Sequence, residues 1–203
     1  MSKYHIYGIG AALVDTEIEV NDGDLQQFGI DKGVMTLVDE ARQSELVSLL
    51  QDHLVASSRA SGGSAANSII AASYFGAKTF YSCKVANDEN GTFYLNDLSS
   101  AQVAFHNDNG SAEGITGKCL VMITPDAERT MNTFLGVSAS LATDDIDVTA
   151  LQNSEYAYIE GYLVTSDTGR PAAKKLRELS KEFGVKTAMS LSDPAIVEYF
   201  HDG

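Results

Sequence analysis

A glycine-rich turn followed directly by a helix pattern is the feature of this sequence that most constrains its fold. The stretch Ala60–Asn67 reads Ala-Ser-Gly-Gly-Ser-Ala-Ala-Asn, and an apolar run from Ser68 to Phe75 follows it. The two glycines allow torsion angles that a Cβ would forbid, and they allow a ligand to approach the main chain closely. We expect Ser64 to be the N-cap of a helix that ends at Phe75 before Gly76.

Two interpretations of this turn are open. A glycine turn at the start of a helix points free N–H groups outward, which suits an oxygen-rich ligand. Asn67 would add an amide that can both donate and accept hydrogen bonds. The alternative is a tight turn before a core helix, because glycine is a common turn residue.

Charge and composition exclude several classes of protein. The formal net charge of −14 argues against nucleic acid and anionic membrane surfaces as partners, because both reward a basic face. No apolar run approaches the roughly 20 residues of a membrane span, and the start of the chain lacks a signal-peptide pattern. Cys83 and Cys119 are far apart, and the four histidines are scattered without metal-ligand spacing. We therefore expect a cytoplasmic protein with reduced cysteines and no metal site.

The first hundred residues alternate between strand and helix patterns. Patterns that predict strands occur at His5–Gly10, Ala12–Val20, Val34–Val38 and Lys78–Val85. Patterns that predict helices occur at Asp24–Ile30, from Asp39 onward, at Ser64–Phe75 and at Thr92–Leu98. This rhythm indicates an α/β fold with a mostly parallel central sheet flanked by helices.

The following section breaks that rhythm. Ala101–His106 is strand-like, and Gly117–Thr124 and Arg129–Phe134 form two alternating strands around a turn at Pro125–Glu128. We expect this hairpin to pair with the strands predicted at 12–20 and 34–38 as a small separate β-sheet.

The α/β rhythm then resumes and still runs at Gly203. Tyr156–Ile159 and Val185–Leu191 are predicted strands, and Pro171–Phe183 and Pro194–Phe200 are predicted helices.

At this point the sequence resembles a known family. Gly62–Asn67, with Gly76 nine residues after the asparagine, resembles the amino-terminal signature of the PfkB/ribokinase family of carbohydrate and nucleoside kinases. Other stretches resemble its adenosine kinase branch: Gly8–Asp15, Thr116-Gly117, Ile123–Arg129, Tyr158–Tyr162 and Leu191–Pro194. Ala11 stands where adenosine kinases carry asparagine, so a nucleoside and another sugar-like alcohol both remain open as substrates.

The resemblance implies a ribokinase-like α/β fold in which residues 1–203 form one incomplete domain. The lid segments would lie at about 12–38 and 102–136. The general base of the family lies in a Gly-Ala-Gly-Asp motif, and its magnesium-associated motif reads Asn-x-x-Glu; this sequence contains neither, nor a P-loop. The chain thus resembles the first three-fifths of a family kinase, with the substrate half and the lid and without the nucleotide half.

The resemblance also implies roles for individual residues. The expected substrate-binding residues are Asp15, Leu37, Gly62, Gly63, Ser64, Asn67, Met131, Thr133 and Tyr162. Asp15, Asn67 and the two glycines would hold sugar hydroxyls, while Leu37, Met131 and Thr133 would cover the substrate from the lid. Arg129 would stabilise the transferred phosphoryl group, a role that suits a planar guanidinium fork. Its alternative is a salt bridge within the hairpin to Glu128 or Asp126.

Two functions of different class follow. The first is an ATP- and Mg²⁺-dependent kinase acting on a hydroxymethyl group of a nucleoside or sugar, with this chain alone inactive. The second is a non-catalytic module that keeps the alcohol-binding cleft and forms a homodimer through the lid sheet. A dehydrogenase is a more distant alternative, because Gly8-Ile9-Gly10 leads into a strand pattern and not into a helix.

Overall fold

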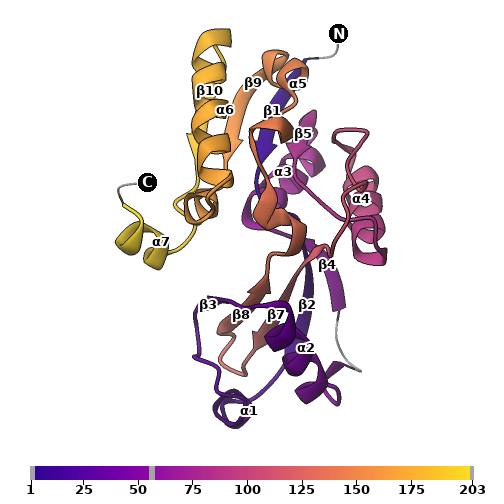
Figure 1. Ribbon diagram of the computed structural model, residues 1–203, viewed down its shortest axis with the longest axis vertical. Coiled ribbons are helices and arrows are strands. Elements are labelled where there is room, and N and C mark those ends of the chain that lie inside the picture. Colours follow the sequence, from indigo (N-terminus) through magenta and orange to yellow (C-terminus); the bar gives the residue numbers. More distant parts are fainter. Residues whose placement is uncertain (1–2, 55–57, 202–203) are drawn as a thin grey trace.

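A computed structural model describes residues 3–54 and 58–201 and arranges them around two β-sheets (Figure 1). One sheet forms the centre of an α/β body, which is the upper part of Figure 1, and the second sheet forms a smaller lobe below it. The predicted α/β class with a mostly parallel central sheet is confirmed. Within the described ranges, no helix combines the length and the apolar content that crossing a lipid bilayer requires.

The central sheet is entirely parallel, and its strand order reverses in the middle. The order across the sheet is β10 (Lys186–Met189), β9 (Ser154–Ile159), β1 (Tyr4–Ile9), β5 (Thr79–Ser82) and β6 (Val103–Ala104). The early strands β5 and β6 lie on one side of β1, and the late strands β9 and β10 lie on the other. In a parallel sheet, such a reversal opens a crevice at the carboxyl ends of the two strands that flank it.

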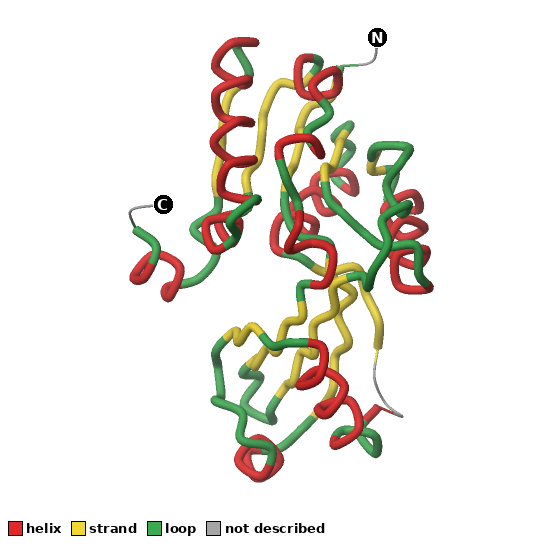
Figure 2. The backbone as a smooth tube through the Cα atoms, in the orientation of Figure 1, coloured by secondary structure: helices red, strands yellow, loops and turns green. Residues whose placement is uncertain are grey.

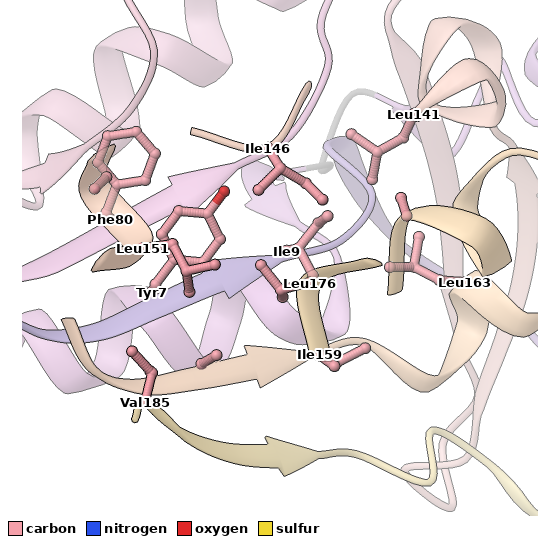
Figure 3. Close-up of a cluster of buried hydrophobic side chains, with 13 residues drawn as sticks. Tyr7, Ile9, Phe80, Leu141, Ile146, Leu151, Ile159, Leu163, Leu176 and Val185 are labelled. Carbon is pink, nitrogen blue, oxygen red and sulfur yellow. The ribbon is translucent and has the colours of Figure 1, made fainter. Parts of the chain in front are cut away.

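Helices cover both faces of this sheet (Figure 2). The helices α3 (Ser64–Tyr74) and α4 (Glu89–Ser100) pack on one face, and α5 (Val148–Gln152) and α6 (Gly169–Phe183) pack on the other. Figure 3 shows the second of these interfaces, where Tyr7 and Ile9 of β1 meet Leu151 and Leu176 from the two helices. These fully buried side chains fix the position of the carboxyl ends of the strands, and therefore also the start of the loops that follow the strands.

The smaller lobe is the separate sheet that the sequence predicts. Its strand order is β3 (Met35–Leu37), β8 (Arg129–Phe134), β7 (Gly117–Ile123), β2 (Leu13–Glu19) and β4 (Ser58–Gly62). The hairpin β7–β8 is antiparallel, and it pairs in parallel with β2 on one side and with β3 on the other. The pairing of the hairpin with both earlier strands is therefore confirmed. We call this sheet the lid.

Two short helices cover the outer face of the lid. They are α1 (Asp22–Gln27), whose N-cap Asn21 forms a capping box with Asp24, and α2 (Glu40–Leu49), which is capped by Asp39. Between them and the sheet lies an apolar cluster: Ile18, Val20, Leu25, Ile30, Leu46, Leu50, Leu120 and Met122. The opposite face of the lid is turned toward the central sheet, and its side chains are the ones that concern the site.

The lid differs from the sequence expectation in two details. The strand β6, predicted within the lid segment 102–136, pairs with β5 in the central sheet, so this lid segment begins at Gly117. The chain returns to the central sheet there because Val103 is buried beside α4. The residue pattern does not predict strand β4, because Ser-Arg-Ala-Ser-Gly shows no apolar alternation; among the described strands it pairs with β2 alone, at the edge of the sheet.

Four further described elements lie near the carboxyl ends of the central strands. They are the short 3₁₀ segments η2 (Gly136–Ser140), η3 (Thr143–Asp145) and η4 (Gly161–Thr165), and the helix α7 (Pro194–Tyr199). Strand β10 is exposed along its whole length, and it pairs with only one neighbour among the described strands.

Candidate functional site

A cavity of about 230 Å³ lies between the lid and the carboxyl ends of β1 and β9. It coincides with the point where the strand order reverses, which is where open α/β sheets bind their ligands. The lid contributes Leu13, Asp15, Met35, Leu37, Cys119, Arg129, Met131, Thr133 and Leu135. The central body contributes Ala11, Gly63, Ser64, Asn67, Ser138, Ala139, Glu160, Tyr162, Leu163, Thr165, Ser166 and Ser192. We call this cavity the candidate cleft.

The structure gathers almost all of the predicted site residues in this one place. Nine of the ten line the candidate cleft, and Gly62 is the exception. The salt bridge considered as an alternative for Arg129 is not formed in the described part of the chain: Asp126 pairs instead with Lys32, at 2.7 Å. The guanidinium of Arg129 therefore remains available to the cleft.

The strand register explains why residues distant in sequence share the inner face of the lid. Asp15 lies opposite Cys119, Cys119 lies opposite Thr133, and Thr133 lies opposite Leu37. A second row, next to the first, joins Glu17, Val121, Met131 and Met35 in the same way. Residues in cross-strand register have neighbouring side chains on one face of a sheet. The lid thus presents a carboxylate, a thiol, a hydroxyl and several apolar groups side by side.

Asp15 is a carboxylate held in a largely buried position. Burial raises the pKa of Asp15 to about 6, while the nearby positive charge of Arg129 limits that rise. Gly62, its close neighbour on β4, makes this position possible, because a Cβ on Gly62 would overlap the carboxylate of Asp15. The glycine does not line the cleft; it leaves the space that the acid occupies.

The start of α3 differs from the prediction in its cap. Gly63 is the N-cap, with φ of 99°, and Ser64 is the first residue of the helix. This left-handed conformation favours glycine, and a Cβ there would also overlap the carbonyl oxygen of Ala11. Asn67 lies in the first turn, where its N–H donates to the carbonyl of Gly63 at 3.0 Å. The amide side chain of Asn67 lines the cleft as expected.

The hydroxyl of Ser64 donates a hydrogen bond to Glu160, a buried glutamate that the sequence interpretation did not single out. Glu160 is only 2% exposed, and its carboxylate accepts hydrogen bonds from Ser64 Oγ at 2.7 Å, Ala65 N at 3.1 Å and Ala11 N at 2.7 Å. Burial raises the pKa of Glu160, and these three donors oppose the rise. Glu160 therefore joins the end of β1 to the start of α3 directly beneath the cleft.

Three buried hydroxyls fix the segments that cross between the lid and the central body. Tyr81 donates to the carbonyl of Ala11 at 2.9 Å, and Tyr94 donates to the carbonyl of Gly62 at 3.1 Å. Ser138 Oγ lies 3.0 Å from both the N–H and the carbonyl oxygen of Ala12. The backbone on either side of the cleft is thus held by side chains from the central body.

The far wall of the cleft contains Tyr162, whose hydroxyl donates to Asp193 at 2.7 Å. Burial raises the pKa of Tyr162, and the hydrogen bond to Asp193 raises it further. On the lid side, burial raises the pKa of the Cys119 thiol to about 12, which favours the neutral thiol at neutral pH.

The arrangement can bind a neutral molecule that carries hydroxyl groups. Asp15 offers an ionised acceptor, Asn67 offers a donor and an acceptor, and Arg129 offers a cationic fork at the edge of the lid. The sequence interpretation missed Glu160 because its partners lie 149 and 95 residues away along the chain. The one local signal was the position of Glu160 immediately after a buried strand.

Comparison with known proteins agrees with this fold. The model of the pfkB family of carbohydrate kinases matches residues 41–202. The guanosine-inosine kinase of Escherichia coli is 22% identical over 200 residues, which cover 95% of this chain and 46% of that protein. The crystal structure of a probable sugar kinase from Rhizobium etli superposes with a TM-score of 0.91, at 28% identity, over 100% of this chain and 60% of that chain.

The adenosine kinase of Sinorhizobium meliloti superposes with a TM-score of 0.90, at 31% identity, over 98% of this chain and 59% of that chain. The chain therefore spans about half the length of the curated relatives it matches and about three-fifths of the similar solved structures. These superpositions confirm the ribokinase-like fold. With four-fifths of its residues inside the family match, the chain belongs to the pfkB family of carbohydrate kinases.

Proposed function

We propose that this chain provides the alcohol-binding cleft and the lid of a kinase that phosphorylates a hydroxymethyl group of a nucleoside or sugar. The observation that carries the proposal is the convergence of Asp15, Asn67, Gly63 and Arg129 on one cavity in a chain of this family. An ionised carboxylate accepts hydrogen bonds from two adjacent hydroxyls, which is how Asp15 would hold a sugar. The apolar residues of the lid would cover the remainder of the substrate.

An adenosine-like nucleoside is the substrate that we favour. The inner face of the lid places Leu37, Met35 and Met131 beside the cleft, and such side chains suit the flat apolar faces of a purine better than they suit a second sugar. The names of the relatives, adenosine kinase and guanosine-inosine kinase, support the same choice.

Arg129 would act on the phosphoryl group during transfer. Its side chain lies on the lid strand β8 at the edge of the cleft, and its charge lowers the pKa of Asp15, so the two groups influence one another. A guanidinium that meets the phosphoryl group chiefly in the transition state would affect turnover more than substrate binding.

We place the binding of ATP and Mg²⁺ mostly outside this chain. No group of three or more acidic, histidine or cysteine side chains in residues 3–54 and 58–201 has the arrangement of a metal site. The sequence also lacks a glycine-rich phosphate loop and the aspartate motif of the general base. Because the aspartate motif of the general base is missing from this sequence, we expect no phosphoryl transfer by this chain alone.

The proposal is tested by titrating the purified 203-residue protein with adenosine, guanosine, inosine and ribose in a calorimeter. We expect adenosine to bind and the Arg129→Ala variant to bind it with less than about threefold weaker affinity, since the arginine serves transfer. A folded protein that binds none of the four compounds would contradict the proposal. ATP-dependent phosphorylation by the chain, purified free of host kinases, would contradict the placement of the nucleotide site.

A chimera tests the role of Arg129 in transfer. Residues 1–203 would be joined to the part of the Sinorhizobium meliloti adenosine kinase that lies beyond the match. We expect Arg129→Ala in this chimera to lower turnover at least about tenfold while the KM for adenosine changes much less, because removing one charge that stabilises the transition state costs a few kcal/mol. Arg129→Lys should restore only part of the rate, because a point charge does not reproduce the fork.

Binding should depend on pH through Asp15. With a pKa of about 6 in the free protein, adenosine affinity should be about tenfold weaker at pH 5 than at pH 7, because only the ionised carboxylate accepts two hydroxyls. The free energy of unfolding should change with pH in the opposite direction. The raised pKa of Asp15 contributes stability that is fully present below the ordinary pKa of 3.8 and is lost as pH rises through about 6. Calorimetry and thermal unfolding of wild type and Asp15→Asn measure both trends; an affinity independent of pH in the wild type would refute this role for Asp15.

Gly62→Ala should reproduce the loss of Asp15. The added methyl group would occupy the space of the carboxylate, so adenosine affinity should fall by as much as it falls in Asp15→Gly, about tenfold or more. In the double variant, Gly62→Ala should cost nothing further, because the group it displaces is already absent. Additive losses in the cycle, measured by calorimetry, would show that Gly62 acts on the substrate independently of Asp15.

We also propose a homodimer through the lid, and the structure limits which surfaces of the lid could form it. The outer face of the lid is covered by α1 and α2, and the inner face lines the cleft. The edges of the sheet at β3 and β4 are therefore the surfaces left for a second copy.

A further inference from the structure

The segment that follows β10 reaches the candidate cleft at a single side chain, Ser192. Strands β9 and β10 are parallel neighbours, so their carboxyl ends meet at the same edge of the sheet. The residues after β9, Gly161 and Tyr162, consequently lie against the residues after β10. Ser192 lines the cleft from this side, whereas Asp15 lines it from the lid.

The backbone of Ser192 is held in an unfavourable conformation. Its φ is +64°, and only Gln102 and Ala127 share a positive φ among the non-glycine residues in the described ranges. Neither of those two lines the candidate cleft. Left-handed torsion angles in residues with a Cβ persist where the surrounding structure imposes them, and they concentrate at ligand sites.

Hydrogen bonds on both sides of Ser192 impose that conformation. Before it, Ser190 N donates to the carbonyl of Ile159 at 3.0 Å. After it, Asp193 accepts from the hydroxyl of Tyr162 at 2.7 Å and from Ile196 N at 3.0 Å, the second of which caps α7. The segment is therefore fixed to β9 on one side and to the helix α7 on the other, and Ser192 lies between the two anchors.

The hydroxyl of Ser192 lies beside the hydroxyl of Ser190. Ser190 Oγ accepts the N–H of Gly161 at 3.1 Å and lies 3.3 Å from Ser192 Oγ. Either hydroxyl can donate in this pair, and in both cases Ser192 Oγ keeps hydrogen-bonding capacity for a ligand in the cleft. Gly161 permits this approach, because a Cβ there would lie 2.7 Å from Ser192 Oγ.

We propose that Ser192 is a substrate-contacting residue whose hydroxyl forms a hydrogen bond with an oxygen or nitrogen atom of the bound alcohol substrate. This inference rests on the proposed function, since it assumes that the cleft holds that substrate. The substrate is then held from both sides, by the carboxylate of Asp15 on the lid and by the hydroxyl of Ser192 on the central body. A molecule without a polar atom opposite Ser192 loses one of these two contacts.

The test compares Ser192→Gly with Gln102→Gly in the 203-residue protein, with adenosine as the probe. Both substitutions relieve a positive φ, so both should leave the melting temperature unchanged or raise it. Only Ser192→Gly removes a hydroxyl from the cleft. We expect it to weaken adenosine binding about three- to tenfold, in the range of one neutral hydrogen bond, while Gln102→Gly binds as the wild type does.

A third variant separates the hydroxyl from the backbone. Ser192→Ala keeps the Cβ and the strained φ but removes the hydroxyl, so it should lose as much affinity as Ser192→Gly without any rise in melting temperature. If wild-type protein binds adenosine and both Ser192 variants bind it equally well, the inference is overturned and the proposed function stands. If the folded wild type binds none of adenosine, guanosine, inosine and ribose, the proposed function fails and the inference fails with it.

Discussion

Replacing Asp15 by alanine is expected to weaken adenosine binding about 10- to 100-fold, because two substrate hydroxyls lose a charged acceptor worth roughly 1.5–3 kcal/mol. The same substitution should not reduce the free energy of unfolding, since burial already disfavours the charge of Asp15 and raises its pKa to about 6. Calorimetry with adenosine measures the first effect, and urea unfolding measures the second.

The matched control for this experiment is Glu17→Ala. Glu17 is the next residue on β2 with its side chain on the same face, yet it does not line the candidate cleft. We expect its removal to change adenosine affinity less than about twofold, because Glu17 makes no contact with the substrate and its charge has only a minor effect on Asp15. Equal losses from Asp15→Ala and Glu17→Ala would point to a general change in charge and would refute a direct contact by Asp15.

Of all these substitutions, Glu160→Ala is expected to lower the free energy of unfolding the most. The substitution leaves the N–H groups of Ala11 and Ala65 and the hydroxyl of Ser64 without their acceptor in a position that is 2% exposed. A buried donor without a partner costs about 1–3 kcal/mol, and release of the desolvated charge offsets part of the sum, so we expect the free energy of unfolding to fall by about 3 kcal/mol. Urea unfolding followed by circular dichroism measures it.

Glu155→Ala provides the comparison on the same strand. Glu155 lies at the other end of β9, where it pairs with Lys3 at 3.5 Å, and both side chains are largely exposed. Its removal should change stability by less than about 0.5 kcal/mol. If Glu160→Ala proved as harmless as Glu155→Ala, Glu160 would not be the connection between β1 and α3 that the hydrogen bonds indicate.

The alternation of strand and helix patterns, which depends on nearest neighbours along the chain, predicted the central sheet and most of its helices. The prediction failed where pairing partners override local pattern. Ser58–Gly62 becomes a strand because β2 offers it a free edge, and Val103–Ala104 joins the central sheet because α4 returns it there. Neither outcome follows from the residues of those segments alone.

The candidate site could likewise be predicted only in part. The resemblance to a family named residues that do meet at one cavity, although their roles remain predictions. It could not show that Gly62 makes space for Asp15, or that Ser64 donates to Glu160, because those relationships depend on atoms brought together by the fold. Glu160 and Ser192 were both missed for that reason: a glutamate after a strand and a serine before an Asp-Pro pair are ordinary in sequence.

The register of the lid has a consequence for how substrate preference can change. Each cross-strand row draws its members from four strands, so altering Cys119 or Thr133 in the middle disturbs neighbours on both sides. The strand β3 is different: it is three residues long, it lies at the edge, and among the described strands it pairs with β8 alone. Leu37 lines the cleft and is nevertheless 49% exposed. Exchanging the whole segment 31–38 between relatives should therefore change substrate selectivity with the least disturbance to the rest of the sheet. Inherited variation in substrate specificity should concentrate in this segment.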